Sequence, residues 1–219
     1  MCIGSSYQLK MAIEENFLKA VEKIKASEKK VNFNQTVDLI INLREFDVRR
    51  EAFNIFISVP NKIKDKKIAG FFERDSSVID SIRKEQFVKY KEKKEIKKLI
   101  KQYDFFIANA KLMPAVATSF GRVLGPVGKM PSPQLGILPT EDDKLVEVLV
   151  SKINSTVRVR VKEPSIKIAI AKQSMDSDKI AENAFVVYQK ILDTLPRKRD
   201  NVRNVKIKLT MDKPEKIQI

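Results

Sequence analysis

Residues 121–139 of the chain read GRVLGPVGKMPSPQLGILP and hold four of its six glycines and four of its nine prolines. Glycine permits backbone conformations with positive φ, whereas proline fixes φ and lacks an N–H donor. We therefore expect a shaped loop over this stretch, rather than a helix or a strand, and we interpret the segments on either side around it.

Composition favours a polyanionic partner. Of the 219 residues 43% are hydrophobic, enough for one or two cores, and 43 basic residues against 28 acidic ones give a net charge of +15. Nucleic acid is the first candidate, and an anionic membrane surface is the second. The absence of histidine and the single cysteine, Cys2, argue against a metal site, a disulfide framework and the commonest general base. We expect no cofactor, no metal and no membrane insertion, and a reducing cytoplasm.

Apolar and polar residues alternate near both ends of the chain, over 36–43, 53–59, 157–161, 166–170 and 205–209. A period of two is typical of strands that bury one face. Three- and four-residue spacing predicts helices over 12–26 and 177–194. The first ten residues lie outside this pattern, and we interpret them as an extension or a cloning remnant.

The middle of the chain has a different pattern. Continuous apolar runs at 66–72 and 104–109 predict strands. Helices are expected between them at 77–90 and 92–102, and after the second strand at 113–120 and 142–153. Such an order indicates a parallel sheet covered on both faces. We predict an α/β protein in which 12–64 and 154–219 form one discontinuous domain, with a three-layer, Rossmann-like domain inserted at 65–153 through a hinge.

The glycine- and proline-rich stretch matches neither G-x-x-x-x-G-K-[ST] nor G-x-G-x-x-G, and its prolines remove donors that a phosphate cradle needs. A structural loop is favoured, or a recognition loop in which Arg122 and Lys129 reach phosphates. The basic strand faces at 155–219 either contact nucleic acid, which we favour, or protect sheet edges from aggregation. No acid and base pair with a convergent partner is apparent, so we expect no catalytic site.

Several motifs resemble the family of the first-numbered protein of the large ribosomal subunit, in its archaeal branch. They are NFNQTVDL at 32–39, DFFIA at 104–108, MP at 113–114, GRVLGPVGKMP at 121–131 and LTM at 209–211. The resemblance runs from about residue 12 to the end of the chain. It implies that the terminal segments form an RNA-binding α+β domain with a split β-α-β core.

The resemblance also implies the partners. Members of this family bind the mobile side stalk of large-subunit rRNA, near the exit site for deacylated tRNA, and many prokaryotic members repress translation of their own mRNA. The chain would then be a ribosomal protein of the cytoplasm and a monomer off the ribosome. Two alternatives stay open: an α/β enzyme that acts on nucleotides through the glycine- and proline-rich stretch, and an mRNA-binding repressor outside the ribosome.

By the same resemblance, RNA contacts fall at the entry to the first strand and along the last one, at Asn32, Phe33, Thr36, Asp38, Asn204, Thr210 and Met211. Hydroxyls, amides and a carboxylate can bond 2′-hydroxyls and base edges, and the Phe and Met side chains can pack on ribose or base planes. Phosphate attraction would come from Lys167, Lys172, Lys206 and Lys208. Asp212 stands where the family usually has glycine, which puts a bulkier, negative group at a position expected to approach RNA closely.

Overall fold

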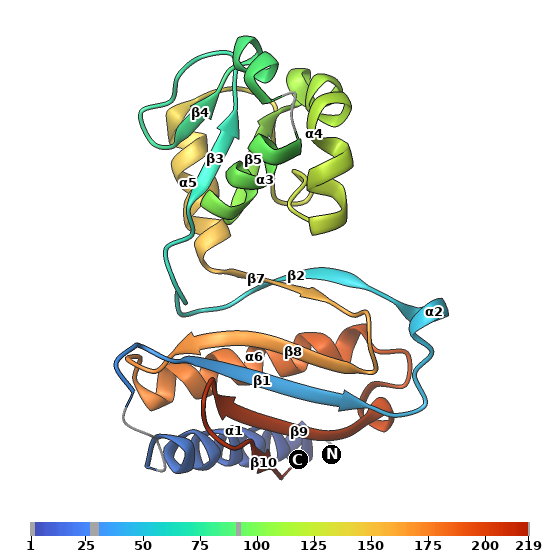
Figure 1. Ribbon diagram of the computed structural model, residues 1–219. Helices are drawn as coiled ribbons and strands as arrows, with labels where there is room; N and C mark the ends of the chain where they lie inside the picture. Colours follow the sequence, from blue (N-terminus) through green and yellow to red (C-terminus); the bar gives the residue numbers. More distant parts are fainter. Residues whose placement is uncertain (1–2, 27–30, 91–92, 219) are drawn as a thin grey trace. The chain divides into compact units, whose positions relative to one another are not determined.

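The structure is a computed structural model that describes residues 3–26, 31–90 and 93–218 (Figure 1). The chain divides into two compact units: unit 1 comprises Met1–Lys64 and Ser155–Ile219, and unit 2 comprises Asp65–Asn154. The sheets of unit 1 are antiparallel and the sheet of unit 2 is parallel, which confirms the predicted α/β class. Within the described ranges, no helix combines the length and apolar character needed to cross a bilayer.

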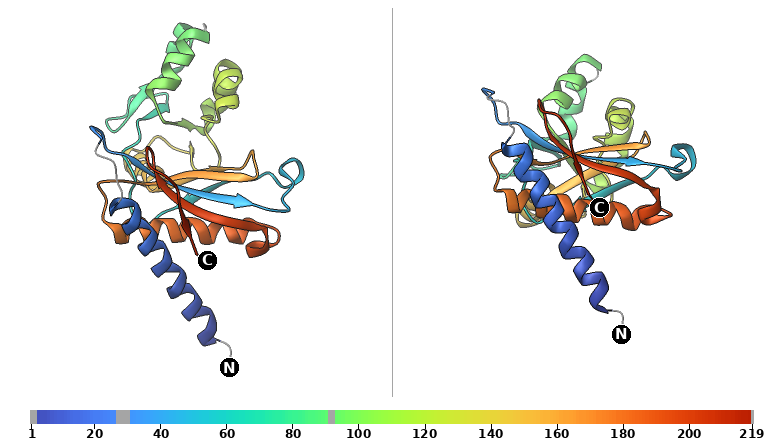
Figure 2. Two further views of the ribbon diagram at one scale, coloured as in Figure 1. Left: turned by 60° about the horizontal axis from the view of Figure 1, so that its bottom comes forward. Right: turned by 90° about the horizontal axis from the view of Figure 1, so that it is seen from below.

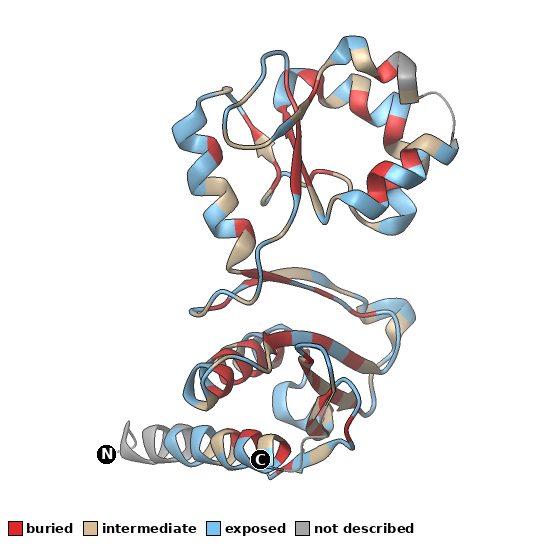
Figure 3. Cartoon of the chain, turned by 60° about the vertical axis from the view of Figure 1, so that its left-hand side comes forward, coloured by how far each residue is buried: buried red, intermediate tan, exposed pale blue. Residues whose placement is uncertain are grey.

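Unit 1 is built on a four-stranded antiparallel sheet in the order β10-β9-β1-β8. Buried positions alternate with more exposed ones along its strands, as the period of two predicts (Figure 3). A second, two-stranded sheet pairs β2 with β7, and β7 lies beside β8. The strands are β1 (Thr36–Leu43), β2 (Asn54–Ser58), β7 (Thr156–Arg160), β8 (Ser165–Lys172), β9 (Val202–Leu209) and β10 (Glu215–Ile217).

Helices α1 (Ile3–Ala26) and α6 (Ser177–Thr194) cover one face of the four-stranded sheet (Figure 2). Phe17 of α1 contacts Tyr188 of α6, with ring centroids 5.8 Å apart. Helix α1 begins at Ile3, so the prediction that this helix starts near residue 12 was wrong. The interpretation of the first ten residues as an extension or a cloning remnant stays a prediction. Once a helix is nucleated, further residues add to it at little cost, and no proline stops it here. Residues 1 and 2 lie outside the described ranges.

Unit 2 has three layers around a parallel sheet in the order β4-β3-β5-β6. One face packs Phe71 and Phe106 against α3, α4 and their flanking 3-10 turns, and the other packs Ile107 against α5. The strands are β3 (Ile68–Phe71), β4 (Asp80–Ile82), β5 (Phe105–Asn109) and β6 (Ile137–Leu138). The helices are η1 (Lys84–Tyr90), α3 (Lys93–Gln102), η2 (Ala110–Leu112), α4 (Met113–Val127) and α5 (Asp143–Asn154).

The prediction of a loop throughout 121–139 was wrong, because α4 continues to Val127. Glycine in a helix costs about 1 kcal/mol relative to alanine. Phe120 and Leu124 of this helix are fully buried in the core of unit 2, and the free energy gained by their burial outweighs that cost. Pro126 lies in the last turn, where its missing N–H removes a single backbone bond. Gly128, with φ of 76°, then ends the helix in the left-handed conformation.

The predicted helix at 77–90 was also wrong. This segment forms the edge strand β4, which pairs in parallel with β3, followed by the 3-10 helix η1. Spacing alone does not separate a short apolar strand from a helix turn, and the neighbouring strand supplied the backbone partners that decided the outcome.

Candidate nucleic-acid interface

The face of the four-stranded sheet opposite α1 and α6 carries the side chains that alternate with the core positions. In the register of β1 with its neighbours, Asp38 lies opposite Lys208, and Ile40 lies between Lys167 and Lys206. We call this surface the polar face. Its residues are Thr36, Asp38, Ile40, Asn42, Ser165, Lys167, Ala169, Lys172, Asn204, Lys206, Lys208 and Lys216.

Lys172 shares the polar face with Lys167 because of an irregularity in the pairing of β8 with β1. Residues five apart in a regular strand lie on opposite sides of a sheet. Here the register shifts, and the adjacent residues Ile170 and Ala171 are both fully buried. This bulge changes the phase of the strand and brings a second lysine of β8 to the polar face, beside Thr36.

At one end of the polar face, three of the predicted RNA-binding residues are joined in one hydrogen-bond network. The backbone N–H of Thr36 donates to Thr210 Oγ1 at 3.1 Å, and the Thr210 hydroxyl donates to the Thr36 carbonyl at 3.2 Å. Lys172 Nζ donates to Thr36 Oγ1 at 2.9 Å. The entry to β1, the end of β8 and the end of β9 are thereby tied together.

Gln35, which the sequence reasoning missed, fixes the neighbouring turn. Its side chain is fully buried, and its Oε1 accepts from the N–H of Met211 at 3.0 Å. Its own N–H donates to Gln173 Oε1 at 3.1 Å. Gln35 could have been identified from the sequence, because it is a polar amide two residues before Val37, in register with the buried positions of the first strand.

Phe33 and Met211 flank this network and are 52% and 57% exposed. Large apolar side chains that stay exposed beside lysines and hydroxyls suit stacking on bases, which every base permits through its π-face. Asn32, before Phe33, is exposed as well. This end of the sheet therefore combines surfaces for stacking, hydrogen bonding and phosphate attraction.

Asn204 lies at the other end of the polar face. Asn42 Nδ2 donates to Asn204 Oδ1 at 2.6 Å, and the Ser165 hydroxyl donates to Asn42 Oδ1 at 2.8 Å. The structure thus distributes the predicted residues along the whole length of β1 rather than gathering them at one point. Asn42 and Ser165 were missed, although the polar phase of Asn42 in its strand was visible in the sequence.

The electrostatics of the polar face centre on Asp38. Partial burial raises the pKa of this carboxyl, and the charges of Lys208 and Lys172 oppose that rise. Lys167 pairs with Glu163 at 4.0 Å in an exposed contact that contributes little. The result is a mainly cationic surface with one carboxylate among the lysines, a pattern that can attract phosphates and still accept hydrogen bonds.

Of the two predicted loop contacts, Arg122 is exposed on α4, whereas Lys129 has an internal role. Lys129 Nζ donates to the carbonyls of Ile100 and Tyr103, both at 2.7 Å. These carbonyls lie at the end of α3, where cations favourably cap unpaired acceptors. The ammonium is therefore engaged within unit 2.

Asp212 lies in the turn after β9. It is 9% exposed, its Oδ2 has no hydrogen-bond partner among the described residues, and its N–H donates to the Leu209 carbonyl at 3.2 Å. The Asp212 side chain is therefore largely buried in the protein, and the expectation that this position approaches RNA closely stays a prediction. Its backbone φ is not positive, so this position does not require glycine.

The carboxyl end of the parallel sheet in unit 2 is where α/β domains usually bind ligands. Here Glu141 accepts from the N–H groups of Glu73 and Arg74, at 2.9 and 3.1 Å, and from Asn109 Nδ2 at 2.6 Å. Burial would raise its pKa, but these hydrogen bonds lower it. The protein's own carboxylate thus occupies donors that a nucleotide phosphate would need. No cluster suited to a metal ion occurs in the described part of the chain.

Comparison with known proteins gives a consistent match over both units. The model of the Ribosomal protein L1p/L10e family matches residues 18–212. A Thermococcus kodakarensis protein named large ribosomal subunit protein uL1 is 35% identical over 217 residues, which covers 93% of this chain and 97% of that protein. A protein of the same name from Methanothermobacter thermautotrophicus is 33% identical, and the match covers 91% of this chain and 97% of that protein. Another from Nanoarchaeum equitans is 35% identical, and the match covers 88% of this chain and 96% of that protein.

Proposed function

The chain belongs to the ribosomal protein L1p/L10e family, and we propose that it binds large-subunit rRNA through the polar face of unit 1. Its relatives are named as large-subunit ribosomal proteins and not as enzymes. The protein is accordingly a structural component of the large ribosomal subunit in the cytoplasm. The alternative of a nucleotide-acting enzyme is not supported. The first part of the glycine- and proline-rich stretch belongs to helix α4, and Glu141 already accepts hydrogen bonds from backbone N–H groups that a nucleotide phosphate would need.

The observation that carries this proposal is the position of Phe33 and Met211 beside the network of Lys172, Thr36 and Thr210. Lysines neutralise phosphates without reading sequence, whereas stacking and hydrogen bonds to bases and 2′-hydroxyls distinguish one RNA from another. Because the hydroxyls are already fixed by hydrogen bonds within the protein, little side-chain entropy is lost when RNA binds.

We propose that the specific RNA is the side stalk of the large subunit, near the exit site for deacylated tRNA. We also propose that the protein's own mRNA binds the same face and that the protein represses its translation. In this hypothesis the two RNAs compete, because one set of side chains serves both. Off the ribosome the protein is expected to be a monomer, and its net charge of +15 would oppose self-association.

Binding of the full chain to a side-stalk RNA fragment and to an unrelated duplex tests the proposal, with affinity measured by filter binding over a range of salt concentrations. The double variant Lys206→Gln and Lys208→Gln should lower the salt slope by about 2, since each phosphate contact contributes about 1. A matched variant, Lys97→Gln and Lys98→Gln, removes two exposed lysines of α3 in unit 2. Equal affinity of the wild type for both RNAs would contradict the proposal.

Two further measurements separate the alternatives. Sedimentation of a cell extract should place the protein with large subunits, whereas a repressor outside the ribosome would remain in the free fraction. Cell-free translation of its own mRNA should fall on addition of the protein and recover when the side-stalk fragment is added. Repression that the fragment does not relieve would contradict a shared site.

A further inference from the structure

A cavity of about 320 Å³ lies at the start of β9, where Asn204 of the polar face and the core residues Val205 and Ile217 all line it. It is lined by three cationic side chains from different elements: Arg199 of η3 (Lys198–Asn201), Arg203 of β9 and Lys216 of β10. No acidic residue is among its lining residues. In the described part of the chain, none of these three cations forms an ion pair.

Tyr188 of α6 also lines the cavity and supplies a donor without an acceptor. The residue is 1% exposed, and its hydroxyl has no hydrogen-bond partner among the described residues. Buried hydroxyls are normally paired, and leaving one unpaired costs about 1–3 kcal/mol. Burial raises the pKa of Tyr188 and nearby Arg199 opposes the rise, so the group is a neutral donor at physiological pH.

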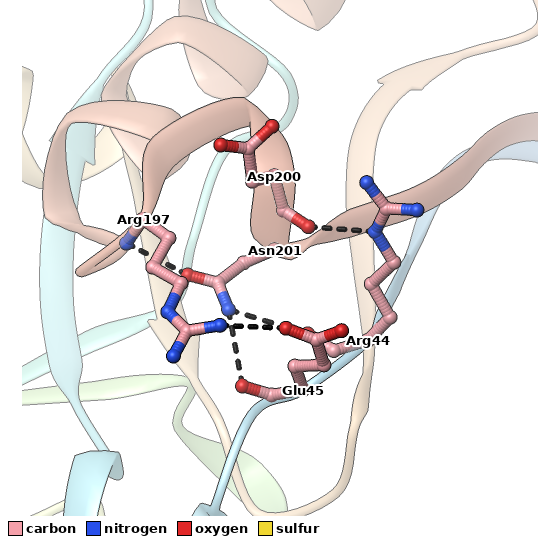
Figure 4. Close-up of polar contacts among 5 residues, drawn as sticks. All are labelled: Arg44, Glu45, Arg197, Asp200 and Asn201. Atoms are coloured by element: carbon pink, nitrogen blue, oxygen red, sulfur yellow. Dashed lines mark hydrogen bonds and ion pairs between the residues drawn. The ribbon is translucent and has the colours of Figure 1, made fainter.

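The segment that carries the two arginines is held in place from within. Between them in the chain lies Asn201, which is 1% exposed and donates through Nδ2 to the carbonyls of Arg44 and Glu45, each at 3.2 Å (Figure 4). These bonds fix η3 and the start of β9 to the end of β1. Arg199 and Arg203 are therefore anchored at their backbones before any ligand binds, which reduces the ordering cost of binding.

We infer that this cavity binds a phosphate group, held by Arg199, Arg203 and Lys216 and by a hydrogen bond from the Tyr188 hydroxyl. Three cations without acidic partners repel one another, and a phosphate relieves that repulsion and satisfies the hydroxyl at once. Since one water occupies about 30 Å³ of liquid, the cavity has room for a phosphate and several waters. The phosphate belongs either to the RNA backbone or to a free phosphate ion in solution. Only the first assignment rests on the proposed function.

The first test needs no RNA. The full chain is titrated with inorganic phosphate at constant ionic strength, and backbone amide NMR signals are followed. We expect saturable shifts at 202–205 and 216–218. Arg203→Gln and Tyr188→Phe should each weaken phosphate binding about tenfold, the effect of losing one hydrogen bond to a charged group. Lys190→Gln, which removes an exposed cation of α6 that does not line the cavity, should have no effect.

Arg203 is exposed, so its variant does not depend on refolding of the core around Tyr188. Absence of saturable shifts in the wild type would overturn the inference. Equal phosphate affinity of Arg203→Gln and Lys190→Gln would also overturn it, because a diffuse surface charge would then account for binding.

The second test identifies the source of the phosphate. If it belongs to RNA, Arg203→Gln should lower the salt slope of side-stalk binding by about 1 relative to Lys190→Gln. If inorganic phosphate binds but Arg203→Gln leaves the salt slope of side-stalk binding unchanged, the cavity is a site for free phosphate. The inference of a phosphate site then still holds. Failure of the proposed function would appear separately, as loss of RNA preference in the wild type with phosphate binding intact.

Discussion

Thr36 and Thr210, far apart in the chain, hydrogen-bond to each other in both directions. The N–H of Thr36 donates to Thr210 Oγ1, and the Thr210 hydroxyl donates back to the Thr36 carbonyl. The pair joins the start of β1 to the end of β9 at the point where the exposed side chains of Phe33 and Met211 emerge. The same hydroxyl thus contributes to folding and to the shape of the candidate RNA-binding surface.

We expect Thr210→Val to lower the free energy of unfolding by about 1 kcal/mol, since two hydrogen bonds at a partly solvated site are lost. It should also weaken side-stalk binding by about 1–3 kcal/mol, the range for direct contacts. Urea denaturation and filter binding measure the two effects. Thr194→Val is the control, because its hydroxyl donates only to the Lys190 carbonyl on the exposed side of α6. Wild-type RNA affinity in Thr210→Val would exclude this hydroxyl from the interface.

Phe33→Ala should weaken RNA binding by about 1–3 kcal/mol, the range for one stacked base, and leave stability nearly unchanged. The reason is that Phe33 is 52% exposed and contributes little to the core. Val148→Ala on α5, where the side chain is 53% exposed, should change neither quantity. If Phe33→Ala instead lowers the unfolding free energy with no loss of RNA affinity, the ring is a packing residue.

Asp38→Asn should reduce the pH dependence of stability. Burial raises the pKa of Asp38 in the folded state, so the folded protein binds this proton more tightly than the unfolded chain. The wild type should therefore gain stability relative to Asp38→Asn as pH falls from neutral through the folded-state pKa. Urea denaturation of both proteins at several pH values measures the difference. An opposite slope would mean that Lys208 and Lys172 outweigh the burial.

Asp212→Gly should leave RNA binding equal or tighter. The change removes a buried carboxylate with one unpaired oxygen, and it removes negative charge next to Met211. Stability should change little, because the relief of the unpaired oxygen is offset by the greater flexibility of glycine in the unfolded chain. Filter binding at two salt concentrations measures the effect. Clearly weaker binding would show that Asp212 is needed to shape the turn after β9.

Lys129→Met should destabilise unit 2 by about 1–2 kcal/mol, because the carbonyls of Ile100 and Tyr103 lose charge-assisted hydrogen bonds. The salt slope of RNA binding should be unchanged, since this ammonium is engaged at the end of α3. Arg122→Gln, which removes an exposed cation of α4, should leave stability unchanged. A reduced slope in Lys129→Met would restore the hypothesis that this residue contacts phosphates.

The sequence alone determined the strands of unit 1 and the side to which most of their residues belong. In β1 and β9 a strict period of two separates core residues from Thr36, Asp38, Lys206 and Lys208, and this local pattern does not depend on which strands become neighbours. The helix α6 followed in the same way from its apolar spacing. The family motifs added Phe33 and Met211, which no periodicity would have distinguished from ordinary apolar residues.

Tertiary structure decided what depends on a neighbour far away in the chain. The burial of Phe120 and Leu124 carried α4 through two glycines, and pairing with β3 turned part of an apparent helix into β4. The bulge in β8 brought Lys172 to the polar face, whereas in a regular strand Lys172 and Lys167 would lie on opposite faces of the sheet. Local sequence fixes the period of a strand, but register, bulges and buried partners are set by contacts between segments, and these contacts assembled both the polar face and the cavity beside it.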